Sequence, residues 1–498
     1  MSDKILISVP SVGYFQFVRN IFFYLIDCYD VNKLYLGVPN EDVIIELRKY
    51  NNRLKDWEQF IFLKELEDAN IKKDVILYIT PEQYNLGIDG IYSICCFHGP
   101  SAKGVTFNQK ILETFDAFFM IGPLHKDTLF EYLEENGVNL PNHLDLYDIG
   151  YPKSDDVING LFNKIETIER LSLDIEKPTL LYAPAFNEHS SLRDQGEEII
   201  KALCNSGKYN VIAKLPIDCH QPIDNFYATG GVDWFAYLSK LSNQYSNFRV
   251  VHDYDIDEYL WCSDILITCV SSVGFEFLAL NKPVIFIDAP KFFDVYLKRI
   301  FPYQDTSSWK NQLTKNGGRQ FGTIVSDVSK LESTVTEILI NKDQYPKNRE
   351  DLDKLLFNKG ESTIIAVETI KKIALSNKLC SRKPSNAHFF GEVFLKRYNE
   401  IFNKSNVVIF GASTFGEITL NFLKEKSFNH LNFMNCFVDN DSKKWGNTIE
   451  NYLINSPSIL EDNSIDMIII ASIHYKEILK QLNELNIGEN IEVLVSSL

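Results

Sequence analysis

A histidine directly follows an apolar stretch in CCFHGPSAKG, residues 95–104. The apolar stretch predicts a strand, so we expect His98 at the carboxyl end of a parallel strand, where open α/β sheets bind ligands. An imidazole at this position can take a proton from a hydroxyl group near neutral pH. Gly99 permits a sharp turn, and Lys103 is close enough to meet a phosphate. The alternative is a turn histidine that caps the following helix.

A pair of serines, Ser271 and Ser272, is the second candidate for chemistry. In SDILITCVSSVGFEFLALNKPVIFID an apolar strand ends at this pair, and a helix begins directly after it. Two hydroxyls and the unpaired amides of a helix N-terminus can bind an anion. Glu276 lies in the first helical turn, where it can face a ribose or another hydroxyl-bearing group. The alternative is an ordinary N-cap, which serine favours whatever the function.

Two further turns after predicted strands carry basic side chains. His189 lies in LLYAPAFNEHSSL, and VIAKLPIDCHQP contains Lys214 and His220. Taken singly, His189 and His220 are better explained as surface residues.

The elements around these turns are predicted from short β-branched runs that alternate with amphipathic stretches, a pattern typical of parallel α/β units. A first Rossmann-like domain is expected over residues 1–155, ending at GYPKSD, a hinge in which Lys153 is available. A helical crossover then leads into a second Rossmann-like domain, residues 156–375. Within it, the polar segment 307–322 is predicted to be a surface loop.

A third, smaller Rossmann-like domain is expected over residues 404–498, after a polar, basic linker and a helix at 376–403. GASTFG follows its first strand, but Ser413 replaces the middle glycine of the dinucleotide fingerprint G-x-G-x-x-G. FVDNDSKKWG and MIIIAS resemble the Rossmann-like domains appended to surface-polysaccharide enzymes and sugar-nucleotide modifying proteins. We predict the topology without bound NAD, and treat Gly411 and Asp439 as ligand candidates. A scaffolding or pairing role is equally consistent.

The composition of the chain limits which kinds of molecule it is expected to bind. A net charge of −17 argues against nucleic acid and against general affinity for anionic lipid. The nine cysteines lack metal-ligand or disulfide-framework spacing, which favours a reduced cytoplasm. The opening residues do not have the pattern of a signal peptide, and no apolar run is long enough to cross a bilayer. Peripheral contact with the inner face of the cell membrane and homo-oligomer formation are left open.

Taken in order, four motifs resemble the CDP-glycerol glycerophosphotransferases of teichoic acid and capsule synthesis. They are HGPSAKG, IGYPKSD, LLYAPAFNEHSSL and SDILITCVSSVGFEFLALNKPVIFID, and they cover about residues 90–340. The resemblance implies a GT-B-like pair of Rossmann-type domains. It also implies transfer of glycerol phosphate, or a similar polyol phosphate, from a CDP-activated donor to a hydroxyl of a glycan or lipid-linked acceptor. His98 would then be the general base, with Ser271 and Ser272 holding the donor phosphates.

The chain departs from the family's usual forms at two places. Lys214 begins the Lys-Leu-Pro that replaces Leu-His-Pro or Met-His-Pro, so a second histidine is missing, and His220, His189 or Lys214 itself are the alternatives for its charge. Before the serines, Cys269 and Val270 replace an aspartate and an aromatic residue.

These departures keep two other functions open. One is a GT-B glycosyltransferase that binds a nucleotide sugar through Glu276 and the paired serines. The other is a non-catalytic scaffold of a polysaccharide assembly system. We expect no tightly bound cofactor, because the CDP-activated donor is a substrate, and no metal site. The sequence leaves assistance by a divalent cation open.

Overall fold

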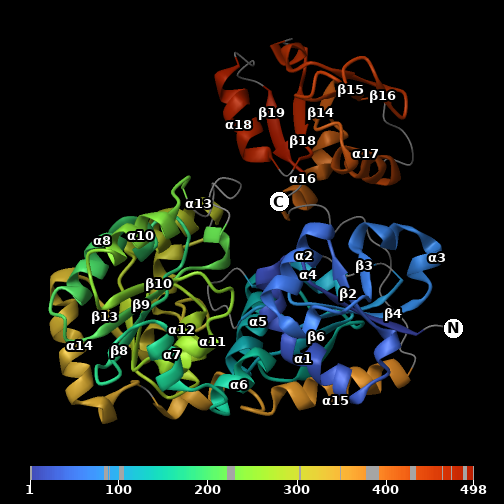
Figure 1. Cartoon of the computed structure of the whole chain (residues 1–498). Helices are drawn as coiled ribbons and strands as arrows, with labels where there is room; N and C mark the ends of the chain where they lie inside the picture. Colours follow the sequence, from blue (N-terminus) through green and yellow to red (C-terminus); the bar gives the residue numbers. More distant parts are fainter. Residues whose placement is uncertain are drawn as a thin grey trace. The chain divides into compact units, whose positions relative to one another are not determined.

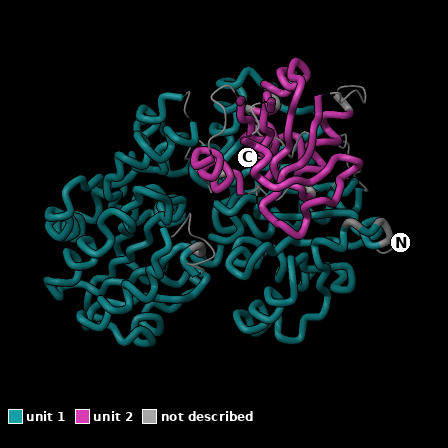
Figure 2. The backbone as a smooth tube through the Cα atoms, turned by 90° about the horizontal axis from the view of Figure 1, so that it is seen from above, with its two compact units in different colours: residues 1–107, 115–381 teal, residues 108–114, 382–498 magenta. Residues whose placement is uncertain are grey.

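In the computed structural model, the described residues form three β-sheets flanked by helices (Figure 1). The chain divides into two compact units, which Figure 2 distinguishes: residues 1–107 with 115–381, and residues 108–114 with 382–498. The first unit contains the first two sheets, and the second unit contains the third. The structure describes residues 3–82, 88, 90–99, 106–220, 230–301, 304–347, 349–376, 392–426, 433–461, 464–472, 474–485 and 491–496.

The first sheet is parallel and has the strand order β3-β2-β1-β4-β5-β6-β7. Its central strands are almost wholly buried apolar runs, as expected when helices cover both faces of a sheet. The strands are β1 (Lys4–Ser8), β2 (Leu34–Val38), β3 (Phe60–Phe62), β4 (Val75–Thr80), β5 (Tyr92–Cys95), β6 (Ala117–Met120) and β7 (Asp145–Asp148). The helices of this region are α1 (Phe15–Cys28), α2 (Glu41–Tyr50), α3 (Ala69–Lys72) and α5 (Pro123–Asn136). The short helix α4 (Gln109–Thr114) is grouped with the second unit.

The second sheet repeats this pattern in the order β10-β9-β8-β11-β12-β13, again parallel. Its strands are β8 (Thr179–Tyr182), β9 (Asn210–Lys214), β10 (Phe248–Val251), β11 (Ile265–Thr268), β12 (Val284–Ile287) and β13 (Thr323–Val325). Its helices include α8 (Ser191–Cys204), α10 (Trp234–Ser242), α11 (Asp257–Cys262), α12 (Val273–Leu278), α13 (Lys298–Ile300) and α14 (Leu331–Ile340). In both sheets the strand order reverses at the first strand, between β1 and β4 and between β8 and β11. Such reversals are where open α/β sheets bind ligands.

One helix returns from the second sheet to the first. In Figure 1, α15 (Ser362–Leu375) lies beside α1. Val367 and Ile370 are fully buried in the core that covers the first sheet. The first domain is therefore completed by residues that follow the second domain in sequence.

The third sheet has the order β16-β17-β15-β14-β18-β19, with β16 as its antiparallel edge strand. Its strands are β14 (Val407–Phe410), β15 (Met434–Val438), β16 (Thr448–Ile449), β17 (Tyr452–Asn455), β18 (Met467–Ile470) and β19 (Glu492–Val495). The helices of this unit include α16 (Glu392–Ile401), α17 (Thr414–Lys426) and α18 (Tyr475–Glu484). The predicted fold class, two Rossmann-type sheets with a smaller third one, is confirmed. Most of the predicted linker lies outside the described residues.

One local prediction is wrong. The segment 307–322 is not a surface loop, because Trp309, Lys315 and Arg319 are all buried. The Nζ atom of Lys315 lies 2.9 Å from a carboxylate oxygen of Glu131 in α5, so a partner far away in sequence allows this charge to be buried.

The predicted crossover after the hinge is helical. It consists of two short helices, α6 (Asp155–Ile158) and α7 (Lys164–Arg170).

Candidate functional site

The backbone that carries His98 is tightly turned. Phe97 has a φ of 58°, an unusual value for a bulky residue, and its ring is buried. The half-buried His98 ring lies against Tyr14 and Phe17, with ring centroids 5.7 Å apart in each pair. Its Nδ1 is 3.3 Å from the Pro81 carbonyl oxygen, which can only accept a hydrogen bond. In the neutral ring, Nδ1 therefore carries the proton, and Nε2 has a lone pair that can accept one.

Gly99 is the point where the two predicted loops meet. Its φ of 150° lies in a region that favours glycine. A Cβ atom at this position would lie 3.2 Å from the Ser272 Oγ atom. The histidine loop of the first sheet and the serine loop of the second sheet are therefore in close proximity.

The hydroxyl of Ser272 does not cap α12, although Ser272 is the N-cap residue. The amides of Gly274 and Phe275 donate instead to the Ser271 and Ser272 carbonyls, at 3.2 and 3.0 Å. Neither serine side chain has a hydrogen-bond partner within the described ranges. The ordinary N-cap explanation does not account for the pair, and both hydroxyls are available to a ligand.

Cys269, which stands where an aspartate was expected, is buried beneath this loop. Its sulfur accepts weak hydrogen bonds from the amides of Ala185 and Ser191, each at 3.5 Å. Val270 packs beside it in a small apolar cluster. The two residues that depart from the usual motif are thus part of the buried packing next to the serine loop.

Lys214 ends β9 and is buried, at 4% exposure. Its ammonium donates to the Leu215 carbonyl at 2.8 Å, its single hydrogen bond to the part of the chain that the structure describes. Burial lowers the pKa of Lys214 to about 8, and Asp255 opposes this shift. The side chain is still mainly charged at pH 7, with donor capacity left for an anion.

Glu276 is held by a charge of the chain itself. Lys153 lies between Glu276 and Asp257, with Nζ-to-oxygen distances of 2.6 and 2.7 Å. Burial would lower the pKa of Lys153, but the two carboxylates raise it, so the ammonium stays charged. The expected contact of Glu276 with a ribose stays a prediction.

A second cation joins the domains next to this ion pair. Arg19 in α1 contacts both Asp255 and Asp257 from the second domain. It also lies 3.2 Å from the Asp156 carboxylate. No sequence motif points to Arg19 or Asp257, because each lies outside the motifs and the two residues are more than two hundred positions apart.

The two other candidate histidines differ in their surroundings. His189 lies 3.4 Å from the Asp194 carboxylate in a cluster of charged side chains. The His220 ring stacks on Tyr254, with centroids 4.5 Å apart. Burial, with the charge of Lys214, lowers the pKa of His220 to about 4. A neutral His220 is a poor substitute for a positive charge, which favours Lys214. Lys103 lies outside the described residues.

In the second unit, Gly411 and Asp439 contact the protein's own groups. The Asp439 carboxylate accepts from the Ala412 amide at 2.8 Å and from the Lys444 ammonium at 3.0 Å. Gly411 has a φ of 123°, and a Cβ atom there would lie 2.3 Å from the Ala471 carbonyl oxygen. These contacts explain both residues by the turn alone, and ligand binding here stays a prediction.

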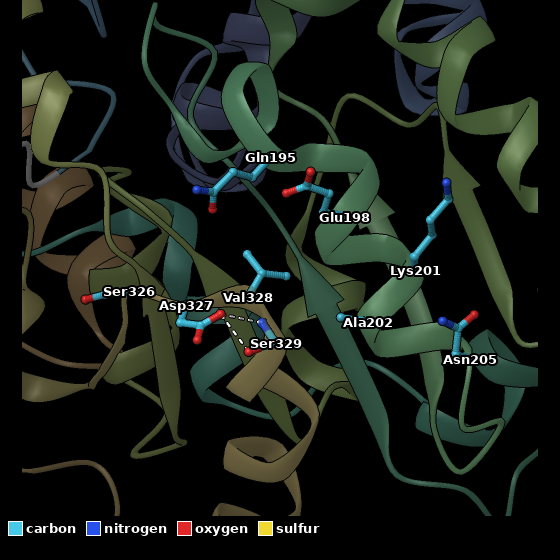
Figure 3. A pocket seen from close by; sticks show the side chains of 9 residues that line it. All are labelled: Gln195, Glu198, Lys201, Ala202, Asn205, Ser326, Asp327, Val328 and Ser329. Atoms are coloured by element: carbon cyan, nitrogen blue, oxygen red, sulfur yellow. Dashed lines mark hydrogen bonds between the residues drawn. The ribbon is translucent and has the colours of Figure 1, made fainter.

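A hollow of about 570 Å³ lies elsewhere, between α8 and the turn that follows β13 (Figure 3). Glu198 and Lys201 line it from α8, and Asp327 lines it from the turn, where it accepts a hydrogen bond from Ser329. None of the predicted site residues lines this hollow. Within the described ranges, no group of three or more His, Cys, Asp or Glu side chains is arranged to hold a metal ion.

A known protein family matches the region of the chain that contains the serine loop. Residues 142–358 match the family described as CDP-Glycerol:Poly(glycerophosphate) glycerophosphotransferase. This part of the chain is similar to that family. The match includes Lys153, Lys214 and Ser272, whereas His98 precedes it. Residues 403–492 match a second family, described as C2185-like, N-terminal.

Curated relatives agree with this family over a limited stretch. A teichoic acid poly(glycerol phosphate) polymerase of Staphylococcus epidermidis is 31% identical over 155 residues, which are 28% of this chain and 19% of the relative. A teichoic acid glycerol-phosphate primase of Bacillus subtilis is 31% identical over 145 residues, 28% of this chain and 32% of the relative. The chain thus spans only about a fifth to a third of these relatives.

Solved structures extend the likeness, as a likeness of fold, to about three quarters of the chain. The wall teichoic acid polymerase TagF superposes with a TM-score of 0.51 at 16% identity, covering 76% of this chain and 90% of that one. A TagF variant gives a TM-score of 0.53 at 15% identity, covering 75% and 89%. These likenesses concern the fold alone and confirm the predicted GT-B-like pair of Rossmann-type domains.

Proposed function

We propose that the protein transfers glycerol phosphate, or a similar polyol phosphate, from a CDP-activated donor to a hydroxyl of a glycan or polymer acceptor. The contact between Gly99 and Ser272 carries the proposal. It brings the backbone of the histidine loop close to a loop with two unbonded hydroxyls. The family of residues 142–358 supports the choice of donor.

In the proposed reaction, Nε2 of His98 takes the proton of the acceptor hydroxyl. The oxygen then attacks the phosphorus that bears the glycerol, and the bond from this phosphorus to the bridging oxygen breaks. CMP leaves with the bond's electron pair, and the product is a phosphodiester. The proton passes from His98 to solvent. Ser271, Ser272 and the Lys214 ammonium oppose the negative charge on the phosphate oxygens.

The direct test is release of CMP from CDP-glycerol or CDP-ribitol in the presence of glycan acceptors. A positioned base contributes about 10²–10⁴-fold to rate, so we expect His98→Gln to lower turnover at least about 100-fold without weakening CDP binding. No CMP release by the wild type would contradict the transferase. Unchanged turnover in His98→Ala would point to the scaffold function instead.

The donor class is tested by nucleotide-dependent melting of the wild type. A ligand that binds only the folded protein raises its melting temperature. We expect CDP and CMP to raise it, and UDP and GDP to leave it unchanged. The reverse result would favour a glycosyltransferase that uses a nucleotide sugar.

We further propose a cytoplasmic location, with a lipid-linked acceptor met at the inner face of the cell membrane. No helix in the described ranges is long and apolar enough to span a bilayer. The expected contact is therefore peripheral, and cell fractionation should find the protein in the soluble fraction or released from membranes by salt. Extraction that requires detergent would count against it.

A further inference from the structure

The hinge segment, residues 150–154, reaches the histidine loop through Tyr151. The Tyr151 hydroxyl donates to the carbonyl oxygen of His98 at 3.2 Å. The same hydroxyl would lie 3.8 Å from a Cβ atom at Gly99. Tyr151 is fully buried, and burial with the nearby charges of Glu276 and Asp257 raises its pKa well above the ordinary value. The hydroxyl therefore keeps its proton and remains a donor.

Two residues later, the hinge segment reaches α12, the helix that directly follows the serine loop, through Lys153. Its ammonium lies 2.6 Å from Glu276, the fourth residue of α12. Its second partner, Asp257, is the first residue of α11. The side chains of Lys153 and Asp257 are each 1% exposed. The hinge segment thus contacts the histidine loop directly and the serine loop through the helix that follows it, with side chains that solvent does not reach.

The backbone between the two contacts is short and ordered. Pro152–Ser154 form one turn of 3-10 helix, and the Ser154 hydroxyl donates to the Tyr151 carbonyl at 2.8 Å. Any displacement of Lys153 is therefore passed on to Tyr151. Buried ion pairs contribute little net stability, because desolvation offsets their attraction. We therefore attribute to this arrangement an effect on the positions of the side chains and not on stability.

We infer that Tyr151 and Lys153 are positioning residues that set the distance between the His98 base and the Ser271–Ser272 loop. The inference rests on the proposed function, since it assigns the two loops to one reaction. Neither residue touches the reacting atoms in this assignment. Their effect is on alignment, and a misplacement of about 1 Å can lower a rate by about 100-fold.

Tyr151→Phe is the first test, because it removes one oxygen atom and preserves the packing of the ring. With CDP-glycerol and a glycan acceptor, we expect kcat to fall about tenfold, with the donor KM within about twofold of the wild type. CDP affinity by calorimetry and the melting temperature should be nearly unchanged. A kcat equal to that of the wild type would overturn the positioning role of Tyr151.

Lys153→Met is the second test, with Lys315→Met as its matched control. Lys315 is also buried and also joins the two domains, through Glu131 and Glu135 of α5, and within the described residues no hydrogen bond or ion pair links it to either loop or to α12. We expect both variants to melt at lower temperature than the wild type. Only Lys153→Met should lose kcat, by about 100-fold, and weaken CDP binding. Equal kcat values in the two variants would show that Lys153 only holds the domains together.

The possible outcomes distinguish a failure of the proposed function from a failure of the positioning inference. A wild type that releases no CMP overturns both the proposed function and the inference. A wild type that turns over, with Tyr151→Phe and Lys153→Met as active as Lys315→Met, overturns the inference alone. If Lys153→Met does not fold, the kcat of Tyr151→Phe decides the question.

Discussion

At the scale of single residues, Lys214 is in an unfavourable place for stability. An ammonium group with one hydrogen bond in a buried site is poorly compensated for the water it has lost. The pKa of Lys214 falls from 10.5 to about 8, which corresponds to a cost on the order of 3 kcal/mol. A bound phosphate would supply the missing partner. A residue that lowers stability at a strand end is better explained by binding than by folding.

The first prediction concerns the pH dependence at Lys214. Because its folded pKa lies below its unfolded value, the cost to stability is complete below about pH 8 and disappears as pH rises towards 10.5. We expect Lys214→Met to be more stable than the wild type in urea at pH 7, by about 2–3 kcal/mol. It should bind CDP more weakly at pH 7, and the affinity of the wild type should fall as pH rises above 8.

The matching control is Lys201→Met, which removes a solvent-exposed lysine of α8. Its stability and its CDP affinity should follow the wild type at every pH. A Lys214→Met variant that binds CDP as tightly as the wild type would remove Lys214 from the donor site.

The residues predicted from sequence were those that follow apolar runs. Lys214 ends a strand, and His98 and Ser271 each follow one by three residues. The carboxyl ends of parallel strands gather at one edge of a sheet. Their partners could not be predicted in this way. The ion pair of Lys153 with Glu276 joins positions 123 residues apart, and no local pattern encodes such a distance. The GYPKSD motif indicates Lys153 as an available cation, but nothing in the motif indicates its partner.

At the scale of elements, the return of α15 depends on glycine in the hinge. Gly150 has a φ of 101°, and a Cβ atom there would lie 2.3 Å from the Phe357 carbonyl oxygen and 2.2 Å from the Ser362 hydroxyl. The start of α15 therefore packs directly against the hinge backbone. The sequence predicted a hinge at this position, but not the helix that closes over it, because the apolar face of α15 does not reveal which sheet it covers.

The second prediction is that Gly150→Ala is strongly destabilising. Alanine would add both left-handed strain and a backbone clash, so we expect a loss of about 3 kcal/mol or more in urea unfolding. Gly207→Ala is the control, because Gly207 has a φ of 64° with nothing within 4 Å of a Cβ atom. That variant should lose only about 1 kcal/mol. Similar losses in both would mean that the return of α15 does not press on the hinge.

The segment 307–322 shows where amino-acid composition fails to predict whether a segment is exposed or buried. Its lysines, asparagines and glycines are typical of exposed loops, yet Lys315 is buried between Glu131 and Glu135. Gly318 has a φ of 88°, and a Cβ atom there would lie 3.1 Å from the Phe275 ring. Polar residues were buried here because α5 supplies the opposite charges, which sequence patterns within the segment do not report.

At the scale of the whole molecule, the two compact units each have cores of their own. Ile370 belongs to the core of the first sheet, and Ile409 belongs to that of the third. In the second unit, the buried carboxylate of Asp439 accepts hydrogen bonds from the Lys444 ammonium and the Ala412 amide, so it has hydrogen-bond partners without a ligand. Each unit therefore has an apolar core of its own, as a separately folding body requires.

The third prediction is that the intact chain unfolds in two calorimetric transitions. Ile370 and Ile409 are both 0% exposed, and replacing a buried isoleucine by alanine costs about 2–5 kcal/mol. We expect Ile409→Ala to lower the transition of the second unit by about 10 °C and to leave the other transition in place. Ile370→Ala should do the opposite, and CDP should raise only the transition that Ile370→Ala lowers, because the proposed donor site lies wholly in the first unit. A single transition that both variants shift together would mean that the units fold as one cooperative body, and the activity of the first unit would then depend on the integrity of the second.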